Sequence, residues 1–377
     1  MIYFDNAATT GVKPHRVIQA VKNALENYSA NPGRSGHEAS LKAAEAVFAA
    51  REKLADFFGA EGPENVVFTM NCTHAANCVL KGVLKYGDHV VVSSLEHNAV
   101  MRPLVKTRVP YSVAEVSLTD DRKTLANFER SIRPNTKLVF CTGASNVFGK
   151  ILPIEKIGQM CFSRKILFAV DAAQTAGVLP IDMKKMNIDY LCIAPHKGLY
   201  APTGVGVLIA NRMVSETLIE GGTGTNSIEL RQPDSLPERL ESGTINVPGI
   251  VGTAAGIDYV NNIGLDKIYT SELNLISRLY RELRRLPQVQ LYTPEPTKGQ
   301  YAPLLSFNVR GIPSTRLADM LSEHNIAVRG GLHCAPMAHA QMGTLESGTV
   351  RVAVATFNTE REIDVFLSVL RQKILKI

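Results

Sequence analysis

The hydrophobic positions along the chain divide it into alternating helical and extended segments. Two early stretches, 14–30 and 37–58, have apolar residues at every third or fourth position, which is the spacing of an amphipathic helix. Short runs that are rich in Val, Ile, Leu and Phe follow, and we predict a strand at each of them. These runs lie at 65–69, 89–94, 137–142, 166–171, 189–194 and 204–210.

The predicted strands are apolar throughout, and helical segments alternate with them. A strand without polar alternation is typically buried on both faces, as in a parallel sheet that helices cover. The pattern therefore predicts an α/β fold with a mostly parallel sheet. Ligands of such folds bind at the carboxyl ends of the strands, so the residues that follow each run are the first candidates for chemistry.

The pattern changes after residue 257, and 377 residues are many for one domain. A long amphipathic helix is predicted at 265–286, short strand and helix signals follow, and a last helix is predicted near 359–375. The first residues read as an extended arm with Asn and Gly turns. We predict a large domain over 15–257 and a smaller α+β domain over 258–377, which the arm over 1–14 joins.

Composition and charge disfavour several classes of protein. The net charge is +6, from 41 basic and 35 acidic residues that do not cluster, so nucleic acid is not an expected partner. None of the 6 cysteines forms a C-x-x-C pair, so we expect no metal site. No apolar run reaches the roughly 18 residues that span a membrane, and no basic, apolar leader opens the chain. Reduced thiols in apolar stretches favour a cytoplasmic protein.

Two charged residues follow predicted strands, and each has a structural and a catalytic interpretation. Lys197 is either a surface lysine in a loop or an amine whose pKa is lowered by burial, which suits a Schiff base. Asp171 is either a helix N-cap or the partner of a protonated pyridine nitrogen. Gln174, about one helical turn further on, is placed to donate to a phenolate oxygen of the same ring.

Two further positions extend this series. A helix is predicted to begin near Thr73, and helix N-termini attract phosphate, although Thr also begins many helices that bind nothing. His97 follows another strand and is either a core or surface histidine or a flat ring that stacks on an aromatic cofactor. Each residue alone has a plain structural explanation. Their order on successive strand ends indicates pyridoxal 5′-phosphate (PLP).

With these residues assembled, the chain resembles the class V aminotransferase family of fold-type I PLP enzymes, and within it the cysteine desulfurases and selenocysteine lyases. The resemblance extends over nearly the whole length. Its motifs are YFDNAATT, NPGRSGH, EHNAV, ASNVFG, VDAAQTAG, HKGLYAPTGVG, ESGTIN, RGGLHCAP and VRVAVATFNT. It implies PLP as the cofactor and a homodimer whose active sites lie at the subunit interface.

The resemblance also implies roles for single residues. Lys197 would hold the cofactor covalently, Asp171 and Gln174 would contact its ring, and His97 would stack on the ring and handle protons. The phosphate would be bound by Cys72 through its backbone, Thr73, His196 and, from the neighbouring subunit, Thr244. The substrate would be bound by Arg351, which grips the carboxylate, and by Arg329, and Asn146 would lie near both the cofactor and the substrate.

Three positions depart from the family pattern. Ala194 stands where many relatives have Ser, and Cys72 stands where many have Thr. Gly198 follows the Schiff-base lysine, where relatives often have an apolar residue. The first two changes remove hydroxyl groups from the expected phosphate site, whereas the assignment of Lys197 does not depend on them.

Cys334 lies in the sequence RGGLHCA, which resembles the motif around the sulfur-accepting cysteine of group II desulfurases. The resemblance implies that its thiolate, favoured by His97, His333 or Arg329, attacks the sulfur of L-cysteine or the selenium of L-selenocysteine. The products would be L-alanine and a Cys334 persulfide. Because Cys334 and Arg351 are only 17 positions apart, the loop is short, and we expect a sulfur-acceptor protein to come to it.

Other activities stay open at this point. Cys334 would be a structural thiol in a class V aminotransferase, in a β-eliminating lyase that releases pyruvate and ammonia, or in a sugar aminotransferase that has no use for Arg351. It would also be structural in a regulator that binds PLP without catalysis.

Overall fold

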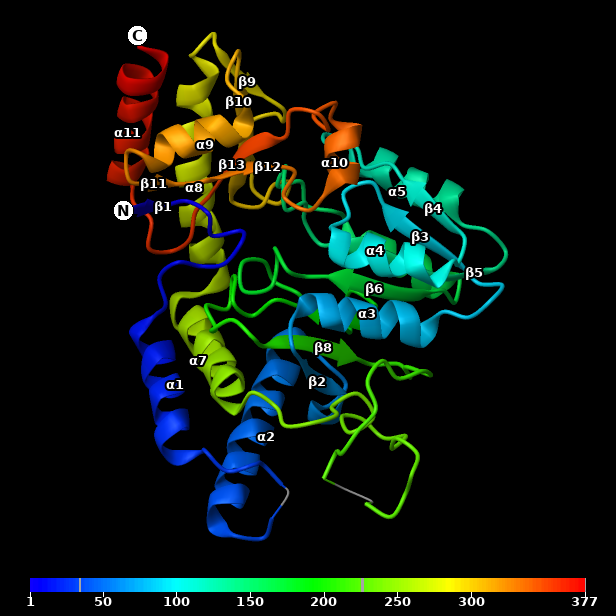
Figure 1. Ribbon diagram of the computed structural model, residues 1–377. Helices are drawn as coiled ribbons and strands as arrows, with labels where there is room; N and C mark the ends of the chain where they lie inside the picture. Colours follow the sequence, from blue (N-terminus) through cyan, green and yellow to red (C-terminus); the bar gives the residue numbers. More distant parts are fainter. Residues whose placement is uncertain (34, 225–226, 377) are drawn as a thin grey trace.

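The computed structural model describes residues 1–33, 35–224 and 227–376, which contain three sheets (Figure 1). Arg34, in the NPGRSGH motif, lies outside the described residues. The largest sheet has seven strands in the order β2-β8-β7-β6-β5-β3-β4. Their bounds are β2 Val66–Thr69, β3 His89–Ser93, β4 Tyr111–Ala114, β5 Thr136–Thr142, β6 Leu167–Asp171, β7 Tyr190–Ile193 and β8 Gly206–Ala210.

The predicted α/β fold with a mostly parallel sheet is confirmed. Only β8 runs antiparallel to its neighbours, β2 and β7, among the strands of the described sheet. Each of the six predicted apolar runs coincides with one of these strands to within two residues at either end. The prediction missed β4, because this short edge strand exposes two of its four residues and lacks a continuous apolar run.

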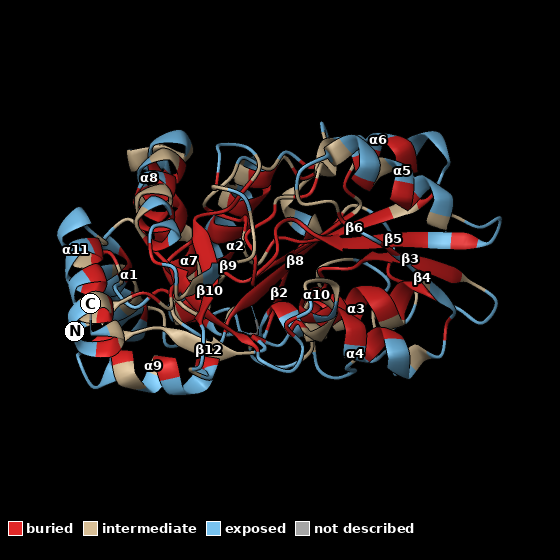
Figure 2. Ribbon diagram, turned by 90° about the horizontal axis from the view of Figure 1, so that it is seen from above, coloured by how far each residue is buried: buried red, intermediate tan, exposed pale blue. Residues whose placement is uncertain are grey.

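Helices cover both faces of the seven-stranded sheet (Figure 2). Val90 and Val92 of β3 pack in the core beneath α3 and α4, whereas Val91 packs in the core on the opposite face. This alternation shows why the strands are apolar throughout. The helices of this part are α1 His15–Asn27, α2 Glu38–Phe58, α3 Cys72–Val83, α4 Asn98–Thr107, α5 Asp121–Ser131, α6 Ile154–Ser163 and α7 Val247–Ile263, with the 3-10 helix η1 Pro63–Asn65.

The two helices predicted first are confirmed as α1 and α2, and the ends of α2 have clear causes. The side chain of His37 accepts a hydrogen bond from the backbone N–H of Ser40 and so caps its start. Gly59 follows its end with a φ of 65°, a left-handed conformation that costs glycine little.

A second, antiparallel sheet has the strand order β12-β13-β10-β9. Its core joins Phe307 of β10, Phe366 of α11 and Leu279 of α8. Helix α7 runs through residue 257, so the predicted division falls inside a helix, and the domain limits stay a prediction. The elements are α8 Leu265–Arg284, β9 Val289–Leu291, β10 Leu304–Val309, α9 Ser314–Ser322, β12 Arg329–Gly331, α10 Pro336–Gln341, β13 Thr349–Ala353, α11 Glu360–Val369 and the π-helix Leu370–Leu375.

The start of the chain lies against this second part. Strand β1 (Ile2–Tyr3) pairs in parallel with β11 (Ile326–Ala327), and Figure 1 shows both termini on this side of the molecule. We call residues 2–13 the N-terminal arm. No helix in the described ranges is long and apolar enough to cross a membrane.

Candidate active site

A cavity of about 210 Å³ lies at the carboxyl ends of the parallel strands and reaches the second sheet. It brings together almost all the residues that the sequence singled out. Those that line it are Cys72, Thr73, His97, Asn146, Asp171, Gln174, His196, Lys197, Arg329, His333 and Arg351. A larger cavity of about 480 Å³ beside α6 contains none of them.

We divide the residues around this cavity into two walls. The strand-end wall is formed by residues that follow strands of the large sheet: Cys72, His97, Asp171 and Lys197. The thiol wall comes from the second sheet and the loop after β12: Arg329, His333, Cys334 and Arg351. Cys334 itself does not line the cavity, but it contacts Arg329, which does.

Lys197 lies in the turn that follows β7, where its backbone N–H bonds the carbonyl of Ala194 at 3.1 Å. The residue is half-buried and lines the cavity, as the catalytic interpretation requires. Burial lowers the pKa of Lys197, and the nearby Asp171 carboxylate opposes that shift. A neutral amine is therefore more accessible here than on an exposed lysine.

Asp171 is the last residue of β6 and is 4% exposed. Its Oδ1 accepts from the backbone N–H of Ala173 at 2.9 Å and from the Cys72 thiol at 3.6 Å. Among the described residues no donor reaches Oδ2, which leaves that oxygen for a partner in the cavity. No helix of the described residues follows Asp171, so the N-cap interpretation is wrong, although Oδ1 caps a turn; the role at a pyridine nitrogen stays a prediction.

The imidazole of His97 begins α4 as its N-cap. Its Nδ1 accepts a hydrogen bond from the backbone N–H of Ala99 at 2.9 Å. The neutral ring therefore carries its proton on Nε2. Burial lowers the pKa of His97, although Asp171 raises it, so the neutral ring is favoured.

The end of the cavity near α3 fits a phosphate group. Helix α3 begins at Cys72, one residue before the predicted start, and Asn71 caps the N–H of His74 at 2.9 Å. The amides of the first turn have no partner within a helix, and they favour an anion. In addition, the buried Nδ1 of His196 has no partner among the described residues, and burial lowers the pKa of this histidine to about 4. A phosphate group would accept hydrogen bonds from the amides of α3 and from the ring of His196.

Two predicted cofactor contacts look different in the folded chain. Gln174 donates through Nε2 to the carbonyl of Ala7 at 3.0 Å, which leaves one amide hydrogen for a ring oxygen. Thr244 is exposed and accepts from Asn31 at 3.4 Å, outside the cavity of its own chain.

Arg329 and Arg351 face each other across β12 and β13. Arg351 is 1% exposed, and its Nη2 forms an ion pair with Oδ1 of Asp5 at 2.7 Å. Its Nη1 donates to the carbonyl of Asn146 at 2.8 Å. Burial lowers the pKa of Arg351, whereas Asp5 raises it and so helps to keep the guanidinium charged.

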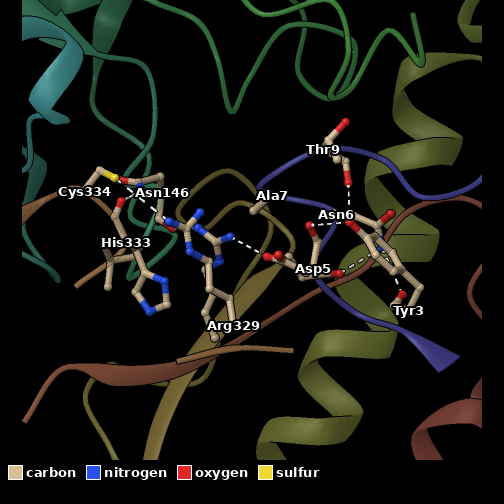
Figure 3. A network of polar contacts seen from close by, with 12 residues as sticks. Tyr3, Asp5, Asn6, Ala7, Thr9, Asn146, Arg329, His333 and Cys334 are labelled. Carbon is tan, nitrogen blue, oxygen red and sulfur yellow. Dashed lines mark hydrogen bonds and ion pairs between the residues drawn. The ribbon is translucent and has the colours of Figure 1, made fainter. Parts of the chain in front are cut away.

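The turn that carries the thiol is strained. His333 and Cys334 have φ values of 50° and 58°, in the left-handed region that non-glycine residues seldom adopt. The side chain of Asn146 donates to the carbonyl of His333 at 2.8 Å, and the backbone N–H of Asn98 donates to that of Cys334 at 2.7 Å. These bonds hold an exposed thiol whose sulfur lies 3.9 Å from Nη2 of Arg329 (Figure 3).

The sequence reasoning missed Asp5, Asn71 and Glu96. Glu96 is fully buried, its Oε1 accepts from the N–H of Thr142 at 2.9 Å, and burial raises its pKa to about 8. The sequence pattern that could have indicated Glu96 is an acidic residue between an apolar strand and His97. Asp5 stood in the quoted YFDNAATT motif, but nothing in its own segment pointed to a partner. No cluster of three metal-ligating side chains occurs within the described ranges.

Comparison with known proteins gives a consistent result. The family model described as aminotransferase class-V matches residues 2–366. A probable cysteine desulfurase of Pyrococcus abyssi is 35% identical over 99% of this chain and 94% of its own. One of Synechocystis sp. is 32% identical over 99% and 91%. The apo structure of a cysteine desulfurase from Thermococcus onnurineus NA1 superposes with a TM-score of 0.91 and 34% identity, over 100% of this chain and 95% of that one.

Proposed function

Because the chain belongs to the aminotransferase class-V family, we propose that its cavity is the active site of a PLP-dependent cysteine desulfurase. The reaction converts L-cysteine to L-alanine and leaves the sulfur as a persulfide on Cys334. One observation supports this most directly: Lys197 and Arg329 line the same cavity, and Arg329 touches the Cys334 sulfur.

The residues present fit PLP. Lys197 would hold it covalently, Asp171 would pair with the ring nitrogen, and His97 would lie against the ring. The first turn of α3, with Thr73 and His196, would hold the phosphate. When bound, the cofactor supplies an electron sink for negative charge at the Cα of an amino acid.

The protein's own groups supply binding and proton transfer. Arg351 presents a planar guanidinium, which suits the substrate carboxylate. Because burial lowers the pKa of Lys197, its free amine can take the Cα proton and return it. The thiolate of Cys334 is the reactive form, and the guanidinium of Arg329 lies beside its Sγ, where the attack would occur.

Transfer of the substrate sulfur to Cys334 needs no added oxidant. The Cys334 thiolate attacks the substrate sulfur, an S–S bond forms and the Cβ–S bond breaks. The electron pair of the broken bond stays with the carbon fragment, which takes up a proton and leaves as alanine. The same steps on L-selenocysteine would form an S–Se bond at Cys334 as the Cβ–Se bond breaks, again with L-alanine as the other product.

The test is a product assay with L-cysteine and L-selenocysteine on wild type and Cys334→Ala, with Cys161→Ala as control. Cys161 is a fully buried thiol of α6, outside the cavity. We expect Cys334→Ala to abolish alanine formation from cysteine, and Cys161→Ala to retain it. Unchanged alanine formation in Cys334→Ala would refute the persulfide, and pyruvate with ammonia would indicate β-elimination.

The homodimer is also part of this proposal. Thr244 is exposed, where it can reach a second subunit, and apolar side chains of α1 and α2 face solvent in one chain. Those that are at least half exposed are Ile18, Leu25, Leu41 and Phe48. Light scattering should give twice the 41.1 kDa chain mass, whereas a monomer would contradict the role of Thr244.

We further propose that an acceptor protein collects the sulfur in the cytoplasm. The strained, hydrogen-bonded turn around Cys334 keeps the thiol at the surface. A persulfide there is within reach of a docked thiol. Transfer to distant acceptors without any docked partner would contradict this part of the proposal.

A further inference from the structure

The N-terminal arm connects both walls of the cavity. The side chain of Asn6 donates to the carbonyl of Ala353 at 3.0 Å, and the backbone of Asp5 forms an isolated parallel β-bridge with the same residue of β13. Further along, the hydroxyl of Thr10 donates to the carbonyl of His196 at 3.0 Å, next to Lys197. The arm is therefore fixed beside β13, the strand that carries Arg351.

The guanidinium of Arg351 has an incomplete set of partners. It has five N–H donors. One bonds Asp5 at 2.7 Å and another bonds Asn146 at 2.8 Å, whereas Nε is buried and has no partner among the described residues. A buried donor without a partner is costly, so the Nε side of this guanidinium is prepared for an acceptor.

The charge around Arg351 supports the same conclusion. Arg329 lies directly opposite on β12, and like charges in that register repel. Asp5 is the carboxylate that pairs with Arg351, and no carboxylate of the described residues pairs with Arg329. Arg329 and Arg351 are two cations, and Asp5 is one anion. One more negative charge would balance them, and the carboxylate of a single substrate molecule supplies it.

We propose that Asp5 is a positioning residue, which holds the guanidinium of Arg351 so that its Nε side meets the α-carboxylate of the substrate. This inference rests on the proposed function for the identity of the substrate. Asp5 uses one oxygen on Nη2, and the hydroxyl of Tyr3 bonds its backbone carbonyl at 3.4 Å (Figure 3). Asp5 thereby fixes the arginine without occupying the Nε side.

The experiment uses the cofactor-loaded protein and two ligands that differ by one group. L-alanine has the carboxylate and ethylamine lacks it. Binding is followed by the absorbance change of the bound cofactor, and KM and kcat are measured with L-cysteine. The variants are Asp5→Ala, Asp5→Glu and the control Asp258→Ala, which removes a carboxylate from a surface ion pair with Lys53.

For Asp5→Ala we expect about a tenfold or larger rise in the Kd of L-alanine and the KM of L-cysteine, as for a lost charge-assisted hydrogen bond. Ethylamine binding and kcat should change by less than about threefold, and Asp258→Ala should match wild type. Asp5→Glu keeps the charge but displaces the guanidinium, so it should also weaken L-alanine binding. It tests the idea even if Asp5→Ala does not fold.

Three results would overturn the inference. Tighter L-alanine binding in Asp5→Ala would show that Asp5 competes with the substrate. An equally large rise in the Kd of ethylamine would show that the substitution had only detached the N-terminal arm. Wild-type binding in both Asp5 variants would show no role at all. If wild type makes no alanine from cysteine, the proposed function fails, while the L-alanine and ethylamine comparison still tests Asp5.

Discussion

The two walls of the cavity are built in different ways. Every member of the strand-end wall lies at or just after a strand or at a helix start within residues 72–197. The thiol wall depends on contacts across the whole chain, because Arg351 is held by Asp5 and the turn of Cys334 is held by Asn146. The strand-end wall is built on one sheet, whereas the thiol wall is held by contacts with segments that lie still farther away in the sequence.

This difference suits the chemistry that we propose. The cofactor would stay in the cavity throughout the reaction, where buried strand ends can hold it. The thiol must face both the substrate and a partner at the surface. Its turn therefore combines an exposed cysteine with a left-handed backbone, and single hydrogen bonds maintain that geometry.

The largest effect is expected at the strand-end wall. Lys197→Ala removes the group that holds the cofactor and moves the Cα proton, and alanine formation should fall by at least about 10²–10⁴-fold. Borohydride treatment followed by peptide mapping should fix cofactor at residue 197 in wild type and not in the variant. The control Lys106→Ala, on the exposed side of α4, should behave as wild type. A Lys197→Ala protein with normal turnover would remove the basis of the proposed function.

A smaller but distinct effect is expected at the thiol wall. Asn146→Ala removes the amide that holds the carbonyl of His333, so the thiol should shift, and misplacement of about 1 Å can cost about 10²-fold in rate. Asn127→Ala is the matched control, since it is equally buried and donates to the carbonyl of Glu115 at 2.7 Å. If both variants lose stability alike and neither loses alanine formation, the thiol turn does not depend on Asn146.

The smallest effects concern the pH dependence of stability. They have opposite signs for Glu96, which precedes His97 of the strand-end wall, and for His333 of the thiol wall. Burial raises the pKa of Glu96 to about 8, so the unfolded chain loses this proton first. Its contribution to stability is complete below pH 4.5 and is lost as the pH rises toward 8. Burial lowers the pKa of His333 to about 2, so its contribution is complete above pH 6.5 and is lost as the pH falls.

Thermal unfolding across the pH range tests this pair. Glu96→Gln should flatten the decline of Tm on the alkaline side, and His333→Gln should flatten the decline on the acid side. Glutamine retains a donor for the carbonyl of Thr349, which Nε2 of His333 contacts at 3.0 Å. Parallel curves for wild type and both variants would mean that neither group titrates differently in the folded chain.

The contrast also explains what the sequence could predict. Asp171 and Lys197 follow buried apolar strands, so periodicity and the strand-end rule located them without knowledge of the fold. Cys334 and Arg351 were found only through the motifs of a family. The bond from Gln174 to Ala7 and the ion pair of Asp5 join segments that no local pattern connects, so they became visible only in the folded chain.

The parallel pairing of β1 with β11 has a consequence for biosynthesis. Translation proceeds from the first residue, so Ile2 and Tyr3 leave the ribosome long before their partners Ile326 and Ala327 exist. The same holds for Asp5, which must wait for Arg351. A nascent chain can complete its large sheet early, whereas the proposed site for an amino acid needs Arg351 of β13. We therefore expect this site to form only after β13 has been synthesised.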